Sequence, residues 1–149
     1  MECRNILEET GGDIDKAVEI LKERNLYKAE KKKQRTATQG LIEGYVHMGG
    51  RIGAIIELNC ETDFVARTDE FKQLAHDLAM QVAAMSPQFI SKEEIPAGAD
   101  VDPQSASLLL QPFIKCTDMT VETLIDQTIA KLGENIKVSR FARFEVGER

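Results

Sequence analysis

The sequence contains no tryptophan, few other aromatic residues and only three cysteines, and these shortages exclude several classes of protein. Aromatic residues make up 5% of the 149 residues, so the hydrophobic core must be mainly aliphatic. Cys3, Cys60 and Cys116 are odd in number and far apart, so they form neither a disulfide framework nor a Cys-x-x-Cys metal pair. This cysteine usage favours a reducing compartment, and we expect a cytoplasmic location.

Long apolar runs, a secretion signal and an excess of positive charge are also missing. No apolar run approaches the roughly 20 residues needed to cross a bilayer, and no basic segment followed by an apolar one opens the chain. The 25 acidic residues outnumber the 19 basic ones and give a net charge of −6. We therefore expect no membrane contact and no direct nucleic-acid contact, because phosphate binding needs a basic surface. The remaining composition, 42% hydrophobic and 30% charged residues, is typical of a globular chain.

Residues 1–35 predict a helical module followed by a basic linker. Gly11-Gly12 separates two helical segments, and Asp13 is placed to cap the second helix. That helix carries a stripe predicted to be buried, made of Ile14, Ala17, Val18 and Leu21. Two helices this short cannot enclose a core, so we expect a further helix before Met1. Five of the eight residues from Lys28 to Arg35 are basic, and we interpret this stretch as a solvated connector that ends the first domain.

Residues 36–149 predict a second domain that contains a small antiparallel sheet. Two strand-like segments, 41–47 and 52–58, flank Met48-Gly49-Gly50-Arg51 and predict a hairpin. A third strand is predicted near the C-terminus, because apolar residues there share one parity and polar residues occupy the other. Its predicted core-facing residues are Ile136, Val138, Ala142, Phe144 and Val146, with Arg140 and Phe141 as exceptions.

Two amphipathic helices are predicted between these strands. The first is capped by Thr68 or Asp69 and ends at Ser86-Pro87, and the second runs from its cap, Thr120, to Gly133. Together these elements predict an α+β fold, in which an N-terminal helical module precedes a three-stranded antiparallel sheet backed by helices on one face.

Reactive groups do not converge in any pattern that predicts catalysis. Cys60 could form a thiol site with Asp63 and either His47 or His76, but a cysteine at a strand end is more often a small packed hydrophobe. Metal-ligand spacing and phosphate-binding glycine motifs are absent from the sequence. We therefore expect a protein that is not an enzyme and that uses no metal, cofactor or small-molecule substrate.

The segment from Asn59 to Arg67 stands out because it carries Phe64 beside the acidic Asp63 between a strand and a helix. Connecting segments seldom carry a large apolar side chain without a packing or recognition role. In one interpretation, Phe64 folds under the chain and staples the helix that starts at Thr68. In the other, Phe64 is a protruding wedge that enters a pocket of a partner.

The sequence of residues 59–65, Asn-Cys-Glu-Thr-Asp-Phe-Val, resembles the signature of the bacterial elongation factor Ts family. Other segments resemble family motifs in the same order along nearly the whole chain: Met1–Arg4, Gly11–Asp13 with Lys16–Val18, Tyr45–His47 with Arg51–Gly53, Gln111–Phe113 and Lys131–Ile136. The resemblance implies that the helical module is ubiquitin-associated-like. It also implies that a helical hairpin of the family is shortened here to Ala97–Leu110.

The resemblance implies a translation factor that binds elongation factor Tu carrying GDP and promotes GDP release by disturbing the magnesium and phosphate site. It also implies a homodimer, since members with one set of core motifs pair to complete the core, and hence a two-plus-two complex. A rival hypothesis is a docking module without exchange activity, and a third is the thiol enzyme centred on Cys60. The residues implied to contact elongation factor Tu are Met1, His47, Thr62, Asp63, Phe64, Val65, Leu132, Gly133, Glu134 and Asn135.

Overall fold

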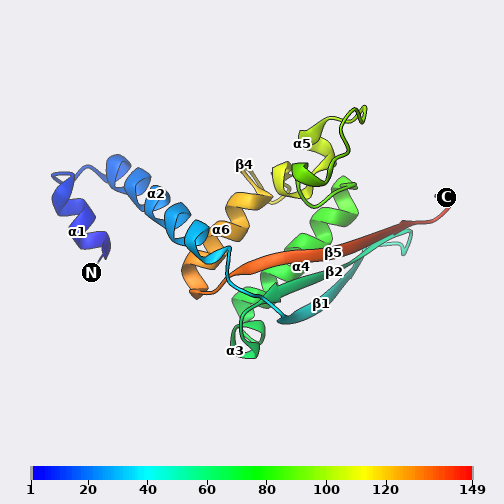
Figure 1. Ribbon diagram of the computed structural model, residues 1–149, viewed down its shortest axis with the longest axis horizontal. Helices are drawn as coiled ribbons and strands as arrows, with labels where there is room; N and C mark the ends of the chain where they lie inside the picture. Colours follow the sequence, from blue (N-terminus) through cyan, green and yellow to red (C-terminus); the bar gives the residue numbers. More distant parts are fainter. Residues whose placement is uncertain (1, 149) are drawn as a thin grey trace.

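The computed structural model describes residues 2–148 and has the mixed α+β architecture that the sequence predicts (Figure 1). Helix α1 (Glu2–Glu9) and helix α2 (Ile14–Lys32) form the N-terminal part. Asp13 caps α2 by accepting a hydrogen bond from the Lys16 amide at 3.2 Å, as predicted. Within the described residues, no helix is long and apolar enough to span a membrane.

The basic stretch is helical over most of its length, because α2 continues through it to Lys32, and Lys28, Lys31 and Lys33 are exposed to solvent. One expectation about the N-terminal part is wrong. The stripe on α2 is largely unburied: Ala17 is buried, but Ile14 and Val18 are exposed. The reason is that α2 extends away from the sheet, with α1 at its far end, so little of the chain covers this part of the helix (Figure 1).

The predicted three-stranded antiparallel sheet is confirmed, with strand order β1-β2-β5. Strands β1 (Gln39–Val46) and β2 (Ile52–Cys60) form the predicted hairpin. Gly49 and Gly50 in the turn have φ angles of 97° and 70°, which glycine adopts without strain. β2 is the central strand and pairs on its other side with β5 (Ile136–Glu145).

Helix α4 (Asp69–Met85) covers one face of the sheet, and α6 (Val121–Leu132) packs beside α4 and against α2. Both caps are as predicted: Thr68 accepts from the Phe71 amide and Thr120 from the Thr123 amide, each at 3.2 Å. The core is mainly aliphatic and its largest fully buried apolar side chains, apart from Ile6 on α1, are Ile56, Leu58, Phe71, Leu78, Val82, Leu108, Val121 and Ile129.

The even-numbered residues of β5 were predicted to face the core along the whole strand, and this prediction is wrong beyond Val138. The pairing with β2 shifts between Glu57 and Leu58, so that Glu57 pairs with Arg140 while Leu58 pairs with Val138. The extra residue of this bulge reverses the alternation of side chains along the rest of the strand. Consequently Phe141 packs against the core, whereas Phe144 is 71% exposed on the opposite face of the sheet.

The segment between α4 and α6 contains short elements held together by two buried amide side chains. Gln111 donates to the Ser105 carbonyl at 2.8 Å and accepts from Gln81 at 3.1 Å. Gln81 in turn accepts from the Ile114 amide at 2.9 Å. The elements of this segment are η1 (Lys92–Glu94), α5 (Pro103–Ala106), η2 (Leu108–Leu110), β3 (Pro112–Phe113) and β4 (Cys116–Thr120).

Candidate partner-binding site

A short helix, α3 (Asp63–Ala66), joins β2 to α4 and presents an exposed phenylalanine. Thr62 caps this helix, its hydroxyl accepting from the Val65 amide at 3.4 Å. Val65 and Ala66 pack toward the core, while Phe64 is 77% exposed. The interpretation in which Phe64 folds under the start of α4 is therefore wrong.

The carboxylate of Asp63 lies beside Phe64 and is also open to solvent. It forms an ion pair with Arg67, 3.1 Å from Nη2, one helical turn away. Both side chains are more than half exposed, so water screens the pair and it adds little to stability. An apolar ring and an accessible charge thus stand next to each other on one turn of helix.

The structure brings the Phe64 segment together with the loop that follows α6. Gly133 ends α6 in a left-handed conformation, with φ of 80°, as predicted for a helix stop. The next residue, Glu134, accepts hydrogen bonds from Thr62 at both carboxylate oxygens, from the amide at 2.9 Å and from the hydroxyl at 2.7 Å. Residues 62–65 and 132–135, predicted to act together, are therefore neighbours in space.

Besides Val65, two further predicted contact residues face inward rather than outward. Leu132 is half-buried against the core, and Asn135 is buried. The Asn135 side-chain amide donates to the Arg35 carbonyl at 2.7 Å, which holds the chain after α2 against this loop. These two side chains support the site from within the protein, whereas Gly133 lies at its exposed surface.

Sequence reasoning missed Glu61 and Arg35 as members of this site. Glu61 Oε2 accepts a hydrogen bond from the Asn135 amide at 2.9 Å, and Arg35 Nη1 lies 3.7 Å from the same carboxylate oxygen. The contacts join residues that are distant in sequence, so no local pattern could have indicated them. The only available signal was the acidic residue inside the motif Asn59–Val65.

The remaining predicted contacts lie elsewhere. His47 follows β1 at the turn of the hairpin, where its Nδ1 lies 2.9 Å from the Tyr45 hydroxyl. Since Cys60 pairs with Gln39 at the other end of β1, His47 lies about 26 Å from the start of the Phe64 segment along the strand. The structure does not bring His47 together with Phe64. Met1 lies outside the described residues.

The side chain of Cys60 is that of a packed residue rather than a nucleophile. It is fully buried, and its thiol donates to the Thr62 carbonyl at 3.0 Å. Burial, with the nearby negative charge of Glu134, raises the pKa of the Cys60 thiol, which opposes formation of a reactive thiolate. In the described part of the chain, no three His, Cys, Asp or Glu side chains are placed to hold a metal ion.

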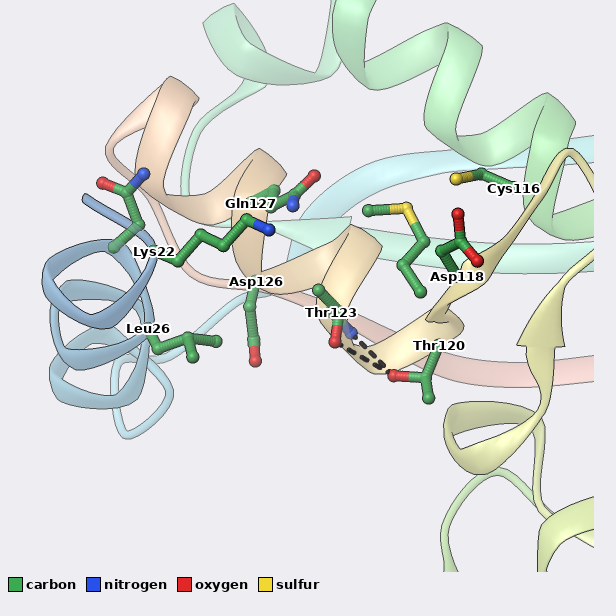
Figure 2. A pocket seen from close by; sticks show the side chains of 10 residues that line it. Lys22, Leu26, Cys116, Asp118, Thr120, Thr123, Asp126 and Gln127 are labelled. Atoms are coloured by element: carbon green, nitrogen blue, oxygen red, sulfur yellow. Dashed lines mark hydrogen bonds between the residues drawn. The ribbon is translucent and has the colours of Figure 1, made fainter. Parts of the chain in front are cut away.

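A hollow lies away from the Phe64 segment, between α2, β4 and α6 (Figure 2). Its volume is about 550 Å³, and its wall includes the Thr120–Thr123 cap of α6 and the carboxylate of Asp126. Asp126 Oδ1 also forms an ion pair with Lys33 Nζ at 3.2 Å, which ties the end of α2 to α6. No residue of 61–67 or 132–135 lines this hollow.

The Lys33–Asp126 pair is partly removed from water, and burial acts on the pKa values of its two groups in opposite directions. Burial alone would lower the pKa of Lys33, but the ion pair with Asp126 and the charges of Glu122 and Glu30 raise it overall. Burial raises the pKa of Asp126, and Lys33 offsets only part of that effect. The pair therefore favours a charged lysine at the junction of α2 and α6.

Comparison with known proteins agrees with the sequence motifs. The family model described as "Elongation factor TS" matches residues 9–104. The chain is 45% identical to elongation factor Ts of Carboxydothermus hydrogenoformans, covering 99% of this chain and 82% of that protein. It is 44% identical to elongation factor Ts of Heliobacterium modesticaldum (99% of this chain, 83% of that protein) and 43% identical to that of Coprothermobacter proteolyticus (99% and 90%).

The alignments also show that these relatives contain additional residues within the matched region. Each spans 178 positions, whereas this chain has 149 residues, so at least the difference of 29 positions has no counterpart here. The match to each relative nevertheless covers 99% of this chain. The chain therefore belongs to the elongation factor Ts family, and its role is that of a translation elongation factor.

Proposed function

We propose that this chain is a guanine nucleotide exchange factor that binds elongation factor Tu carrying GDP and promotes the release of GDP. The observation that carries the proposal is the 77% exposure of Phe64 on a capped turn of helix, next to the accessible carboxylate of Asp63. A large aromatic ring presented this way can fill a partner's pocket and supply much of the binding energy.

Exchange follows from binding by thermodynamic linkage. A factor that binds the nucleotide-free GTPase more tightly than the GDP-bound form must weaken GDP binding by the same ratio. Mg²⁺ neutralises part of the phosphate charge in such GTPases, so displacing the groups that hold it loosens the nucleotide. In this mechanism Asp63 and Phe64 act on the partner, and no covalent bond changes. The protein is then not an enzyme and needs no cofactor of its own.

The proposed contact surface has two parts. The first is formed by Asp63, Phe64 and Gly133, with Thr62, Val65, Leu132, Glu134 and Asn135 behind them as its support. The second is the β-hairpin that bears His47, which reaches a different domain of elongation factor Tu. Met1 is part of the same proposal on the strength of the family motif alone. The proposed setting is the cytoplasm, with no direct contact to nucleic acid.

We also propose that two copies pair through the face of the sheet that α4 does not cover. Four large apolar side chains are exposed on this face: Ile42, Val46, Ile55 and Phe144. The strand register places them close together, since Gly53 lies between Val46 and Phe144, and Ile55 is opposite Ala142. A sheet face this apolar is typical of an interface rather than of a surface in contact with water. The resulting complex would contain two copies of each protein.

The exchange proposal is tested by the rate at which a fluorescent GDP analogue leaves elongation factor Tu. We expect micromolar concentrations of the intact chain to accelerate release, and the exchange proposal is refuted if they do not. Pairing is tested separately by sedimentation equilibrium, where we expect twice the chain mass of 16.6 kDa. Phe144→Glu should give a monomer, whereas Tyr27→Glu, at an exposed aromatic residue on α2, should leave the dimer intact. A monomeric wild-type chain would refute the pairing proposal.

A further inference from the structure

The loop after β2 and the loop after α6 each supply a carboxylate to the backbone of the other. Glu134 accepts from the Thr62 amide at 2.9 Å, and Glu61 accepts from the Asn135 amide at 2.9 Å. In both cases the acceptor comes immediately before the residue whose amide is bound by the opposite loop. This reciprocal arrangement, which we call the carboxylate clasp, consists of Glu61, Thr62, Glu134 and Asn135.

Thr62 is the most fully restrained member of the clasp. Its amide and hydroxyl both donate to Glu134, its carbonyl accepts from the Cys60 thiol at 3.0 Å, and its hydroxyl also caps α3. Hydrogen bonds to a carboxylate are stronger than those between neutral groups, and these are partly shielded from water. Thr62, two residues before Phe64, is therefore held through its amide, its carbonyl and its hydroxyl.

The ring of Phe64, by contrast, is not held by packing. With 77% of its surface exposed, its place in space is set by the backbone of α3, a single turn of four residues. A helix this short has no stability of its own. The packing of Val65 and Ala66 holds one side of this turn, and the clasp restrains its N-terminal end at Thr62.

We propose that Glu134 is a positioning residue for exchange, acting through Phe64. By fixing Thr62 it preforms the α3 turn, so that the free protein already presents the ring in its binding orientation. Preforming a contact removes the cost of ordering it on binding, which otherwise reduces affinity. The inference rests on the proposed exchange function, since positioning has meaning only if Phe64 enters a partner.

The test is a double-mutant cycle on catalysed GDP release from elongation factor Tu. Glu134→Ala should lower kcat/KM about tenfold, because the turn that presents Phe64 must then be ordered on binding. Glu134→Gln should retain most activity, because its carbonyl can accept from the Thr62 amide while its NH₂ donates to the hydroxyl. Glu93→Ala, at an exposed residue of η1, is the matched control and should exchange at the wild-type rate.

The decisive comparison is made in the Phe64→Ala background. If Glu134 acts through the ring, adding Glu134→Ala to Phe64→Ala should cause less than a twofold further loss. A merely structural role would cost the same factor in both backgrounds, and that result would overturn the proposal. Wild-type activity in Glu134→Ala would overturn it as well.

Amide hydrogen exchange of the free protein provides a readout that needs no partner. We expect the Thr62 amide to exchange at least about tenfold faster in Glu134→Ala, while the amide of Leu78 in the centre of α4 is unchanged. If the Thr62 amide of Glu134→Ala is as well protected from hydrogen exchange as in the wild type, the clasp is refuted, whatever the rate of nucleotide exchange. If the wild-type chain gives no exchange activity, the proposed function fails and positioning fails with it. If the wild-type chain is active but Glu134→Ala lowers kcat/KM by the same factor with and without Phe64→Ala, only the positioning role is refuted.

Discussion

Replacing Phe64 with alanine separates a recognition role from a packing role by its effect on stability. A fully buried phenylalanine removes about 150–250 Å² from water, and a ring that is 77% exposed removes about a quarter of this, ~50 Å². At about 25 cal/mol per Å², the substitution should lower the free energy of unfolding by about 1.2 kcal/mol. Phe71 on α4 is fully buried, and Phe71→Ala should cost about 3–5 kcal/mol.

In contrast to its small effect on stability, Phe64→Ala should have a large effect on nucleotide exchange. If the ring fills a pocket of elongation factor Tu, Phe64→Ala removes a contact worth at least about 2 kcal/mol, or about 30-fold in kcat/KM. Urea unfolding measures the first quantity, and release of a fluorescent GDP analogue measures the second. Tyr27→Ala, at another exposed aromatic residue, is the control and should change neither. The reasoning is refuted if Phe64→Ala unfolds as readily as Phe71→Ala, or if the stable variant exchanges nucleotide at the wild-type rate.

Three further substitutions test the structure around the site. Gly133→Ala should cost about 1 kcal/mol in urea unfolding, because φ of 80° strains any other residue although the added methyl group meets nothing closer than 4.0 Å. Gln111→Ala should cost about 1–3 kcal/mol, since the Ser105 carbonyl loses its donor, and an unchanged midpoint would show that the buried amides are dispensable. Lys33→Met should cost about 1 kcal/mol after allowance for solvent screening. Because the pKa of Lys33 is raised above 10.5, this difference from wild type should be complete below pH 10.5 and shrink as the pH rises further. A difference that is constant to pH 12 would contradict the ion pair with Asp126.

Features that depend on a few neighbouring residues were predictable. Caps at Asp13, Thr68 and Thr120 follow from a side-chain oxygen that reaches an amide three residues along the chain. The β1–β2 hairpin follows from two apolar segments separated by Gly49-Gly50. The motif Asn59–Val65 likewise indicated where the candidate site lies, because a large apolar side chain in a connecting segment has either a packing or a recognition role.

Predictions that depended on distant partners were less successful. The alternation along β5 was misread because the bulge opposite Glu57 arises from pairing with β2, and its trace in β5 is confined to the two exceptions Arg140 and Phe141. The stripe on α2 was assigned to a core, yet burial of Ile14 and Val18 depends on what packs against the helix rather than on helical spacing. The two interpretations of Phe64 could not be separated for the same reason.

The sequence by itself determined α4 and α6, the three-stranded antiparallel sheet and the resemblance to the family, because periodicity, caps and motifs are properties of short segments. Only the tertiary structure decided that Phe64 is exposed, that Phe144 lies on the uncovered face, and that Asn135 supports the site from inside. It alone also joined Glu134 to Thr62, 72 residues apart. A hydrogen bond between two loops depends on where the intervening sheet and helices place their ends, and that placement is settled only when the whole core packs.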